Sequence, residues 1–346
     1  MCGMGVDIGS LIQKEPCSFH DLKNRVVVID GHNVLHQFLS IIRQRDGTPL
    51  KDSKGRVTSH LSGLFYRTAN LIEAGVYPVY VFDGPPHPLK MRTITERQRR
   101  REQAEREWKE ALEKGDVETA RVKAQQTSRV TDEIIDQSKK LLLALGVPFI
   151  QSPSEGEAQG SYMVKKGDAY AIGSQDYDSL LFGSSVLIRN LTSSTRRKLP
   201  GKQAYTEVKP ERINLDANLR TLDVTREQLI DIAILIGTDY NLGVKGLGPK
   251  KSYQLIKKNG SIENIISNLP DSDKDKIQDY KEIRDLFLKP VVMEDYTIKW
   301  GMINDEEVYR ILCDEHQFTR ERVEPVIDKY KKLCRIKGQR NLLEFQ

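Results

Sequence analysis

Val26-Val27-Val28-Ile29-Asp30 is a short apolar run, rich in β-branched residues, that ends in a carboxylate. Its length and composition predict a strand buried on both faces, as the strands of a parallel sheet are. Apolar residues at helical spacing follow it, from Val34 to Ile42. A second such run, Pro78-Val79-Tyr80-Val81-Phe82, also ends in an aspartate, Asp83. The chain therefore begins as strand, helix, helix and strand, and each strand has an acid at its carboxyl end.

The rest of the chain repeats this alternation. Further strands are expected at residues 147–150, 169–172 and 186–189, and a hairpin or loop at residues 195–205. Further helices are expected at residues 59–74, 134–145 and 225–236, near Ser154 and Pro249, and in most of the charged C-terminal region. Strands separated by helices predict an α/β fold with a mostly parallel central sheet flanked by helices.

The composition is typical of a soluble globular protein. The 346 residues suffice for roughly one large or two ordinary domains. Because no apolar run could cross a bilayer and the first residues do not resemble a secretory signal, we expect an intracellular protein. The four cysteines are scattered without a C-x-x-C pair, which disfavours a zinc site and indicates free thiols.

The stretch Ser152-Pro153-Ser154-Glu155-Gly156-Glu157 places two carboxylates where a helix is expected to begin. Ser154 and Glu157 match a capping box, and acids in a first helical turn are favoured by the helix dipole. Taken alone, this pattern favours a structural cap. Residues two apart on a regular helix do not share a face, so both glutamates can serve one site only if the first turn forms its wall.

A larger set of acids changes that interpretation. In an open parallel sheet, sites form outside the carboxyl ends of the strands, and most of these acids fall at or just past strand ends. One aspartate after a strand is commonplace, but a set of this size at one edge is not. The set is Asp30, Asp83, Glu155, Glu157, Asp176, Asp178 and Asp239.

So many carboxylates can stay ionised together only if cations neutralise them. Oxygen ligands without His or Cys suit hard ions such as Mg²⁺ or Mn²⁺. Mg²⁺ usually takes only one or two carboxylates directly, so some of the acids are expected to act through water. Two such ions about 4 Å apart are the usual device for phosphodiester hydrolysis, which needs no histidine base. The acids therefore predict phosphoryl chemistry on a nucleic acid.

Two glycine-containing segments do not match nucleotide-binding loops. Asp30-Gly31-His32-Asn33 follows the first strand, where a dinucleotide-binding site requires a Gly-rich loop. Residues 243–248 are Gly-rich, but they follow a helix and not a strand, so they match neither a dinucleotide-binding loop nor a P-loop.

Residues 90–129 are rich in Arg, Lys and Glu, and Gly115-Asp116 divides them into two expected helices. A helix that is polar nearly all round is either solvent-bridging or a binding surface, and without context a solvated hairpin is slightly favoured. The net charge of +5 indicates nucleic acid only weakly. The distribution of the charge is more informative.

These motifs resemble those of the flap structure-specific endonucleases, the 5′-nuclease family that processes Okazaki fragments, in its archaeal form. The resemblance runs from about Met4 to the C-terminal tail. The segments that carry it are Val28-Ile29-Asp30, Val81-Phe82-Asp83-Gly84, Pro153-Ser154-Glu155-Gly156-Glu157-Ala158, Ser174-Gln175-Asp176-Tyr177-Asp178 and Gly237-Thr238-Asp239-Tyr240.

The resemblance implies two divalent metals, Mg²⁺ with Mn²⁺ as a substitute, and a cut at the junction of a 5′ flap with duplex DNA that leaves a 5′-phosphate and a 3′-hydroxyl. It also implies 5′–3′ exonuclease activity, in Okazaki-fragment maturation and base-excision repair. The metal ligands would be Asp30, Asp83, Glu155 and Glu157 on one side and Asp176, Asp178 and Asp239 on the other.

The basic segment resembles the family's helical arch, through which the single-stranded flap threads, with Lys90 and Arg97 reaching the scissile phosphate. A cation beside a phosphate that gains charge is electrostatic catalysis. The Gly-rich turn resembles a helix–hairpin–helix that grips duplex DNA, often through a monovalent cation, although an ordinary glycine turn is the alternative. The DNA contacts implied in these parts are Lys90, Arg97, Glu155, Gly237, Asp239, Gly243, Gly246, Gly248 and Lys250.

Further implied contacts lie elsewhere in the chain. His36 stands where the family usually has a tyrosine that stacks on a base, and it offers a smaller face. The region around Thr58, with Phe318 and Arg322, is implied to hold a one-nucleotide 3′ flap. The tail resembles a sliding-clamp (PCNA) binding box through Gln339, Leu342 and Phe345, weakened because Gln346 replaces the second aromatic.

The implied organisation is a monomer with five parts: an N-terminal nuclease region (1–105), an arch segment linking the two halves (106–122), an internal nuclease region with the helix–hairpin–helix (123–265), a C-terminal helical region (266–337) and a clamp-binding tail (338–346). A bubble or junction nuclease of the same family is the nearest alternative, and such relatives tend to carry long insertions. A non-catalytic DNA-binding or clamp-associated scaffold is the other, but every expected carboxylate is present.

Overall fold

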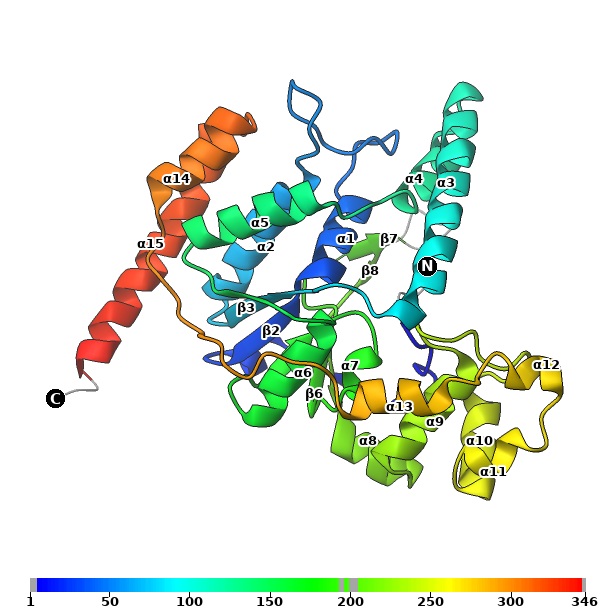
Figure 1. Ribbon diagram of the computed structural model, residues 1–346. Helices are drawn as coiled ribbons and strands as arrows, with labels where there is room; N and C mark the ends of the chain where they lie inside the picture. Colours follow the sequence, from blue (N-terminus) through cyan, green and yellow to red (C-terminus); the bar gives the residue numbers. More distant parts are fainter. Residues whose placement is uncertain (1–4, 193–195, 199–204, 344–346) are drawn as a thin grey trace.

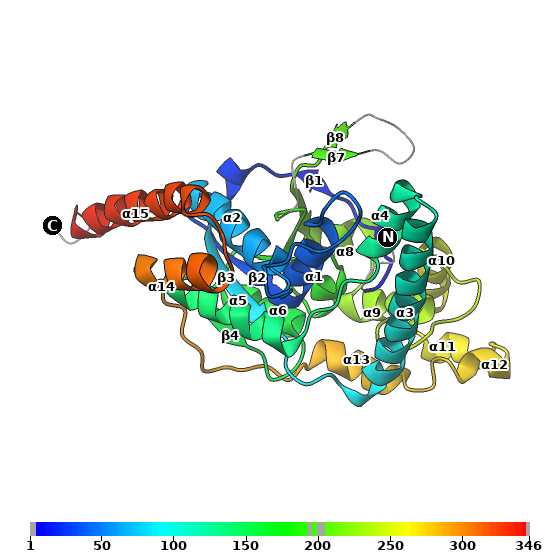
Figure 2. The same ribbon diagram turned by 90° about the horizontal axis from the view of Figure 1, so that it is seen from above.

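A seven-stranded sheet forms the centre of the computed structural model, which describes residues 5–192, 196–198 and 205–343 (Figure 1). The strand order is β1-β9-β6-β5-β2-β3-β4. The bounds are β1 Glu15–Pro16, β2 Val26–Asp30, β3 Tyr77–Phe82, β4 Phe149–Gln151, β5 Ala171–Gly173, β6 Val186–Arg189 and β9 Glu211–Asn214. A separate antiparallel pair, β7 (Arg196–Lys198) and β8 (Tyr205–Glu207), projects beside the sheet and confirms the expected hairpin (Figure 2).

Five adjacent strands, from β6 to β4 in this order, are parallel to one another, and β9 pairs antiparallel with both β6 and β1. The chain first builds β2, β3 and β4 toward one side, and then returns to place β5 and β6 on the other side of β2. Strand order therefore reverses between β2 and β5. In open α/β sheets, ligands bind beside the carboxyl ends of the strands at such a switch point.

Helices cover both faces of the sheet because alternate strand residues point to opposite sides. Val27 and Ile29 pack on one side and Val28 on the other. The first face is covered by α1 (Gly31–Ile41), α2 (Ser59–Glu73), α5 (Asp132–Ala144), α14 (Asp305–Tyr309) and α15 (Arg320–Leu343). The second is covered by α6 (Gly156–Lys166), α7 (Asp178–Leu181), α9 (Arg226–Ile236), α10 (Pro249–Asn259) and α13 (Tyr280–Leu288).

Apart from the two helices of the basic segment, the remaining helices are short or peripheral. They are α8 (Leu215–Leu222), α11 (Glu263–Ile266), α12 (Asp271–Lys274), two 3₁₀ helices (Phe19–Leu22 and Pro88–Lys90) and a π-helical stretch (Arg310–Glu315). Within the described ranges, no helix is long and apolar enough to cross a membrane. The predicted α/β class with a mostly parallel sheet is confirmed.

The basic segment forms two helices that lie side by side, α3 (Met91–Glu113) and α4 (Val117–Gln125), as expected from Gly115-Asp116 (Figures 1 and 2). Gly115 takes a φ of +70°, and Asp116 caps α4 by accepting from the Thr119 amide. The two helices pack through buried alanines: Ala104, Ala111, Ala120 and Ala124. The small side chains let the helices approach closely, while the charged residues remain outside.

Candidate metal and nucleic-acid site

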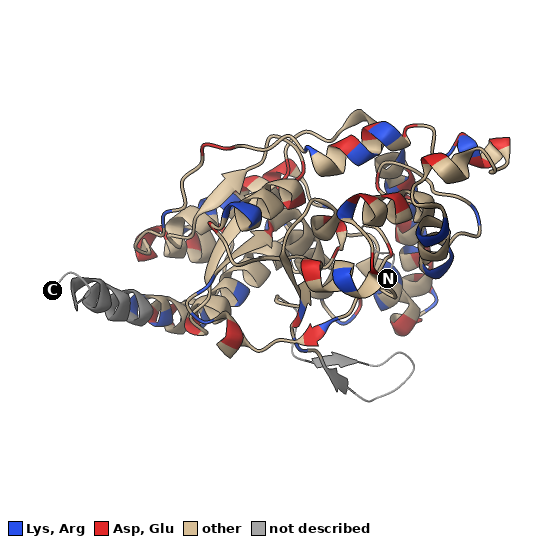
Figure 3. Cartoon of the chain, turned by 90° about the horizontal axis from the view of Figure 1, so that it is seen from below, with Lys and Arg blue, Asp and Glu red and all other residues tan. Residues whose placement is uncertain are grey.

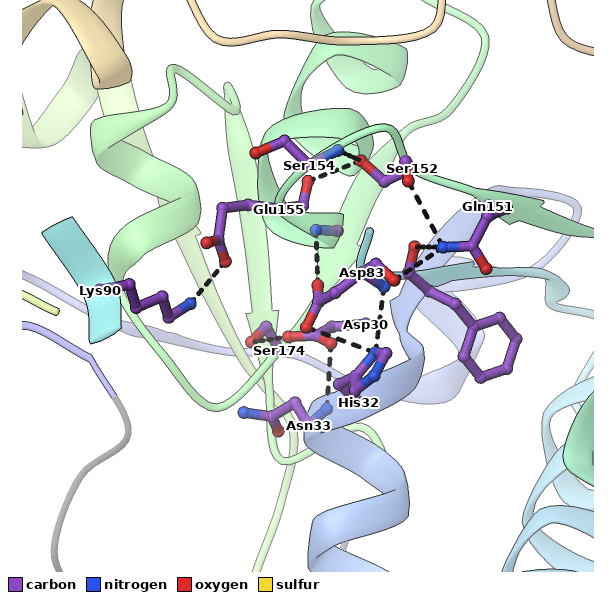
Figure 4. A network of polar contacts seen from close by, with 12 residues as sticks. Asp30, His32, Asn33, Asp83, Lys90, Gln151, Ser152, Ser154, Glu155 and Ser174 are labelled. Atoms are coloured by element: carbon purple, nitrogen blue, oxygen red, sulfur yellow. Dashed lines mark hydrogen bonds and ion pairs between the residues drawn. The ribbon is translucent and has the colours of Figure 1, made fainter. Parts of the chain in front are cut away.

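The carboxyl ends of the central strands bring the predicted acids toward one place. Asp30 is the last residue of β2 and is 5% exposed, and its Oδ1 caps α1 by accepting from the Asn33 amide at 3.0 Å. Asp83 directly follows β3, and its Oδ1 accepts from the Gly156 amide at 2.6 Å (Figure 4). Parallel strands thus deliver two carboxylates to the same edge, where each meets the start of a helix.

The other acids come from the following elements. Asp176 lies three residues past β5, and Asp178 is the first residue of α7, where its Oδ1 accepts from the Val6 amide at 2.8 Å. Asp239 follows α9 and is 8% exposed. Asp178 interacts electrostatically with Asp239 and with Glu155, so acids from both expected sides of the site lie in one neighbourhood.

The capping box expected at Ser154 and Glu157 is wrong. Helix α6 begins at Gly156, and its N-cap is Glu155, with extended backbone and no side-chain cap. The preceding turn is organised instead by buried Ser152, whose hydroxyl donates to the Glu155 carbonyl at 3.0 Å and accepts from the Ser154 amide (Figure 4). Because this turn satisfies Ser154, the helix starts later than the pattern predicts.

The late helix start explains how two glutamates at i and i+2 serve one cluster. Glu155 lies outside the helix and reaches Lys90, with neighbouring charges from Asp83 and Asp239. Glu157 lies in the first turn and has Asp178, Asp30 and Asp176 as its charged neighbours. The first turn therefore forms a wall of the site, with Glu155 on the side of Lys90 and Glu157 on the side of Asp30, Asp176 and Asp178.

Burial and mutual repulsion raise the pKa values of these acids. Burial, with the Asp83 charge, raises the pKa of Asp30 to about 7, and burial, with Asp239, raises that of Asp178 to about 7. The same causes raise the pKa of Glu157 and of Asp176 well above the usual range. The cluster thus lacks positive charge at neutral pH.

Two basic side chains supply part of that charge. Lys90, at the end of the Pro88–Lys90 turn, places Nζ 2.6 Å from Glu155 Oε2 and 3.4 Å from Asp239 Oδ2. Burial alone would lower the pKa of Lys90, but the surrounding carboxylates raise it well above its ordinary value. Arg97, two turns into α3, pairs with Asp239. The base of the helical hairpin therefore places two cations against the acids.

The donor set fits divalent cations bound through oxygen. Glu157 Oε1 is buried and has no hydrogen-bond partner among the described residues. A cation would satisfy that oxygen and relieve the repulsion that raises the pKa values of its neighbours. Within the described ranges, no three His, Cys, Asp or Glu side chains are already arranged as an ion's ligands. Some of the acids would therefore bind the cation through water, because Mg²⁺ usually keeps several waters.

Two polar residues beside the acids were missed by the sequence reasoning. Asn33 Nδ2 donates to Asp176 Oδ2 at 2.8 Å, and Ser174 Oγ donates to Asp30 Oδ2 at 3.3 Å. Both sit within three residues of a predicted ligand, and Ser174 also begins one of the segments that carry the family resemblance; these are the signals that could have indicated them. Their partners lie on other strands and depend on long-range pairing.

Comparison with known proteins identifies the family. The XPG N-terminal domain matches residues 7–104 and the XPG I-region matches residues 146–239. "Flap endonuclease 1" of Pyrococcus abyssi is 51% identical over 342 residues, which cover 99% of this chain and 98% of that protein. The protein of the same name from Archaeoglobus fulgidus is 51% identical over 330 residues, 95% of this chain and 97% of that one. The chain belongs to the flap endonuclease 1 family.

Solved structures agree with this family. The flap endonuclease-1 of Methanococcus jannaschii superposes with a TM-score of 0.77 at 41% identity, over 96% of this chain and 100% of that one. The catalytic core of Rad2 in complex with DNA substrate has a TM-score of 0.68 at 23% identity, over 93% and 97% of the two chains, and shows a shared fold. The predicted resemblance to flap endonucleases is confirmed, and with it the prediction of a DNA-processing nuclease.

Basic and acidic residues alternate along many of the helices, including α3 and α13 (Figure 3). His36, on α1, contacts the hydroxyl of Ser128, in the segment after α4, at 3.3 Å. Burial and the charges of Arg101, Arg97 and Arg43 lower its pKa to about 4, so the ring is neutral at physiological pH. His36 therefore offers a neutral aromatic face among arginines.

The Gly-rich turn connects α9 to α10. Gly246 and Gly248 have open space where a side chain would be, and Gly248 is the N-cap of α10, so backbone groups there are accessible. Gly243 differs, because its backbone is buried against Ile236 and a Cβ would lie 2.3 Å from that residue's backbone. Gly237 similarly faces the backbone of residue 242 and ends α9 with a φ of +112°. Lys250 is exposed in the first turn of α10.

The residues expected at a 3′-flap pocket lie where two distant segments meet. Gln317 Oε1 accepts from the Ser53 amide at 2.8 Å, which ties the loop after α1 to the turn after the π-helical stretch. Thr58 is the buried N-cap of α2, Phe318 is half-buried and Arg322 is exposed. Of the expected clamp-binding residues, Gln339 and Leu342 lie in α15 where side chains are not described, and Phe345 lies outside the described residues.

Proposed function

We propose that this chain is a metal-dependent, structure-specific endonuclease that cuts 5′ flaps at their junction with duplex DNA. Membership of the flap endonuclease 1 family supports the reaction. The observation that carries the proposal is the convergence of seven carboxylates with Lys90 and Arg97 at the switch point of the sheet. This arrangement provides both cation ligands and phosphate-directed cations.

The site residues act by binding, orienting and compensating charge. Divalent cations bound among the acids would lower the pKa of the attacking water and neutralise charge on the leaving oxygen. Lys90 and Arg97 would then exchange their carboxylate partners for oxygens of the scissile phosphate, because those oxygens gain charge in the transition state. Both cations come from the base of the α3–α4 hairpin, so a threaded flap would bring its phosphate to them.

Several finer points belong to the same proposal. The cations would be two Mg²⁺ ions, replaceable by Mn²⁺, held by Asp30, Asp83, Glu155, Glu157, Asp176, Asp178 and Asp239. Exposed backbone at Gly246 and Gly248 would hold duplex DNA through a monovalent cation. We also propose that this intracellular monomer has 5′–3′ exonuclease activity and serves Okazaki-fragment maturation and base-excision repair.

A double-flap DNA with labelled 5′ flap tests the proposal. In Mg²⁺ we expect one main cut at the flap junction, with a 5′-phosphate on the downstream product and no cut in EDTA. Asp178→Ala should abolish cleavage while binding flap DNA with unchanged affinity in EDTA. Cleavage of wild-type protein in EDTA, or full turnover by Asp178→Ala, would rule out the metal assignment.

The proposed sliding-clamp contact needs a separate experiment. Deletion of residues 339–346 should leave basal flap cleavage unchanged and remove stimulation by the clamp. A truncated chain that the clamp stimulates as strongly as the full chain would show that the tail is not used.

A further inference from the structure

Two carboxylates at the sheet's switch point lie at or just past the ends of neighbouring strands. β2 and β5 pair in parallel, with Ile29 opposite Gly173. Asp30 ends β2, and Asp176 lies just past β5, so the two acids face each other across the β2–β5 boundary. Electrostatic repulsion between them contributes to the raised pKa of Asp176.

Asn33 crosses the boundary from the β2 side. Its backbone amide donates to Asp30 Oδ1 at 3.0 Å, and its side-chain Nδ2 donates to Asp176 Oδ2 at 2.8 Å. The residue is 6% exposed. The backbone bond caps α1 and would form with any residue except proline. The bond to Asp176 requires the asparagine side chain.

Ser174 crosses the same boundary from the β5 side. Its hydroxyl donates to Asp30 Oδ2 at 3.3 Å (Figure 4). The same hydroxyl accepts from the Asp176 amide at 3.2 Å. The residue is 4% exposed. Each of the two residues therefore contacts both Asp30 and Asp176: Asn33 through its backbone amide and its side-chain amide, and Ser174 through its hydroxyl alone.

We propose that Asn33 and Ser174 are positioning residues that hold Asp30 and Asp176 in the orientation needed to bind a divalent cation. The inference rests on the proposed metal-dependent function. Both donors are neutral, so they orient a carboxylate oxygen without supplying the positive charge that a cation would replace. Asp176 Oδ1 remains available for the cation or its water, because Asn33 engages Oδ2. Partners of this kind commonly change metal affinity or activity 10- to 100-fold when removed.

Manganese binding to the DNA-free protein tests the proposal without any cleavage step. Free Mn²⁺ is measured by electron paramagnetic resonance for wild type, Asn33→Ala and Asn33→Leu, the last of which keeps the side chain's shape. We expect both variants to bind Mn²⁺ roughly 10-fold or more weakly. The Mg²⁺ concentration for half-maximal flap cleavage should rise by a similar factor, while flap-DNA affinity in EDTA stays within about twofold of wild type. Ser174→Ala should act in the same direction.

Asn218→Ala is the matched control for a purely structural effect. Asn218 is 3% exposed on α8, and its amide exchanges hydrogen bonds with the backbone of Gln13, far from the acids. It should lower the melting temperature and leave Mn²⁺ affinity unchanged. If a folded Asn33 variant binds Mn²⁺ as tightly as wild type, the proposal is wrong. Because Mn²⁺ binding needs no turnover, absence of flap cleavage by wild type would contradict the proposed function alone.

Discussion

Asp178→Asn should make the metal-free protein more stable at neutral and higher pH while abolishing its activity. Burial, with the nearby charge of Asp239, raises the pKa of Asp178 from 3.8 to about 7. The native state therefore binds this proton more tightly than the unfolded chain does. By linkage, the stability of the metal-free protein falls as the pH rises from about 4 to about 7. An ionised Asp178 is thus a cost to the folded state above pH 7.

The size of the effect follows from the pKa difference. About three pKa units at 1.36 kcal/mol each correspond to about 4 kcal/mol, which is an upper bound. Neighbouring acids share the protons of the cluster, so we expect a gain of about 1–3 kcal/mol for the variant at pH 8. Asparagine keeps an oxygen that can accept from the Val6 amide, a contact of 2.8 Å in the wild type. The variant therefore loses the charge without losing that bond.

Urea unfolding in EDTA, followed by circular dichroism at pH 8 and pH 4, measures the effect. The gain should shrink to within about 0.5 kcal/mol at pH 4, because the wild-type carboxyl is then protonated in the native state. Asp285→Asn is the control and should change little at either pH, because Asp285 is exposed on α13 with its carboxylate 4.0 Å from Lys289. A variant that is no more stable than wild type at pH 8, or equally stabilised at both pH values, would refute the reasoning.

Three further changes test other parts of the molecule. Lys90→Glu or Arg97→Glu should slow single-turnover cleavage about 100-fold or more. Flap affinity should fall by less than about threefold. If the rate and the affinity fall by the same factor, these side chains only attract the DNA backbone. Burial lowers the pKa of His60 to about 4, so the wild-type protein should lose stability as the pH falls from about 6.5 to about 4. His60→Gln should make this loss, measured by urea unfolding, smaller. An unchanged dependence of stability on pH would contradict this. Gly47→Ala should speed proteolysis of the α3–α4 hairpin, because Gly47 has a φ of +88° and a Cβ there would lie 2.5 Å from a side chain of α4. Gly55→Ala is the control: Gly55 has a φ of +80° but lies in open space, so proteolysis of the hairpin should not change.

The fold and the acids at strand ends could be predicted because both depend on local sequence. An apolar run such as residues 26–29 favours a buried strand whichever strands it pairs with, and an acid directly after it lies at the carboxyl end of that strand. The division of the basic segment at Gly115 is equally local, since the turn needs the positive φ that glycine allows. These features needed no knowledge of which strands pair.

The start of α6 and the partners of the acids could not be predicted in this way. Ser154 and Glu157 match a capping box, but Ser152 organises the turn that precedes the helix, and Glu155 becomes the N-cap. Asn33 meets Asp176 only because β5 pairs with β2, and a sequence pattern does not specify that pairing. The contact of Lys90 with Glu155 likewise joins residues 65 positions apart.

The placement of these partners explains how one fold tolerates so many acids. Helices α1 and α6 both begin at the site, so their positive ends face Asp30 and Glu155. These dipoles and the neutral donors supply only partial charge, and the raised pKa values show that the deficit remains. Lys90 and Arg97 offset part of it, but only while the base of the hairpin stays in place. If a threaded DNA draws these two side chains toward its phosphates, the acids must gain cations in exchange. Flap binding and metal binding should therefore strengthen each other.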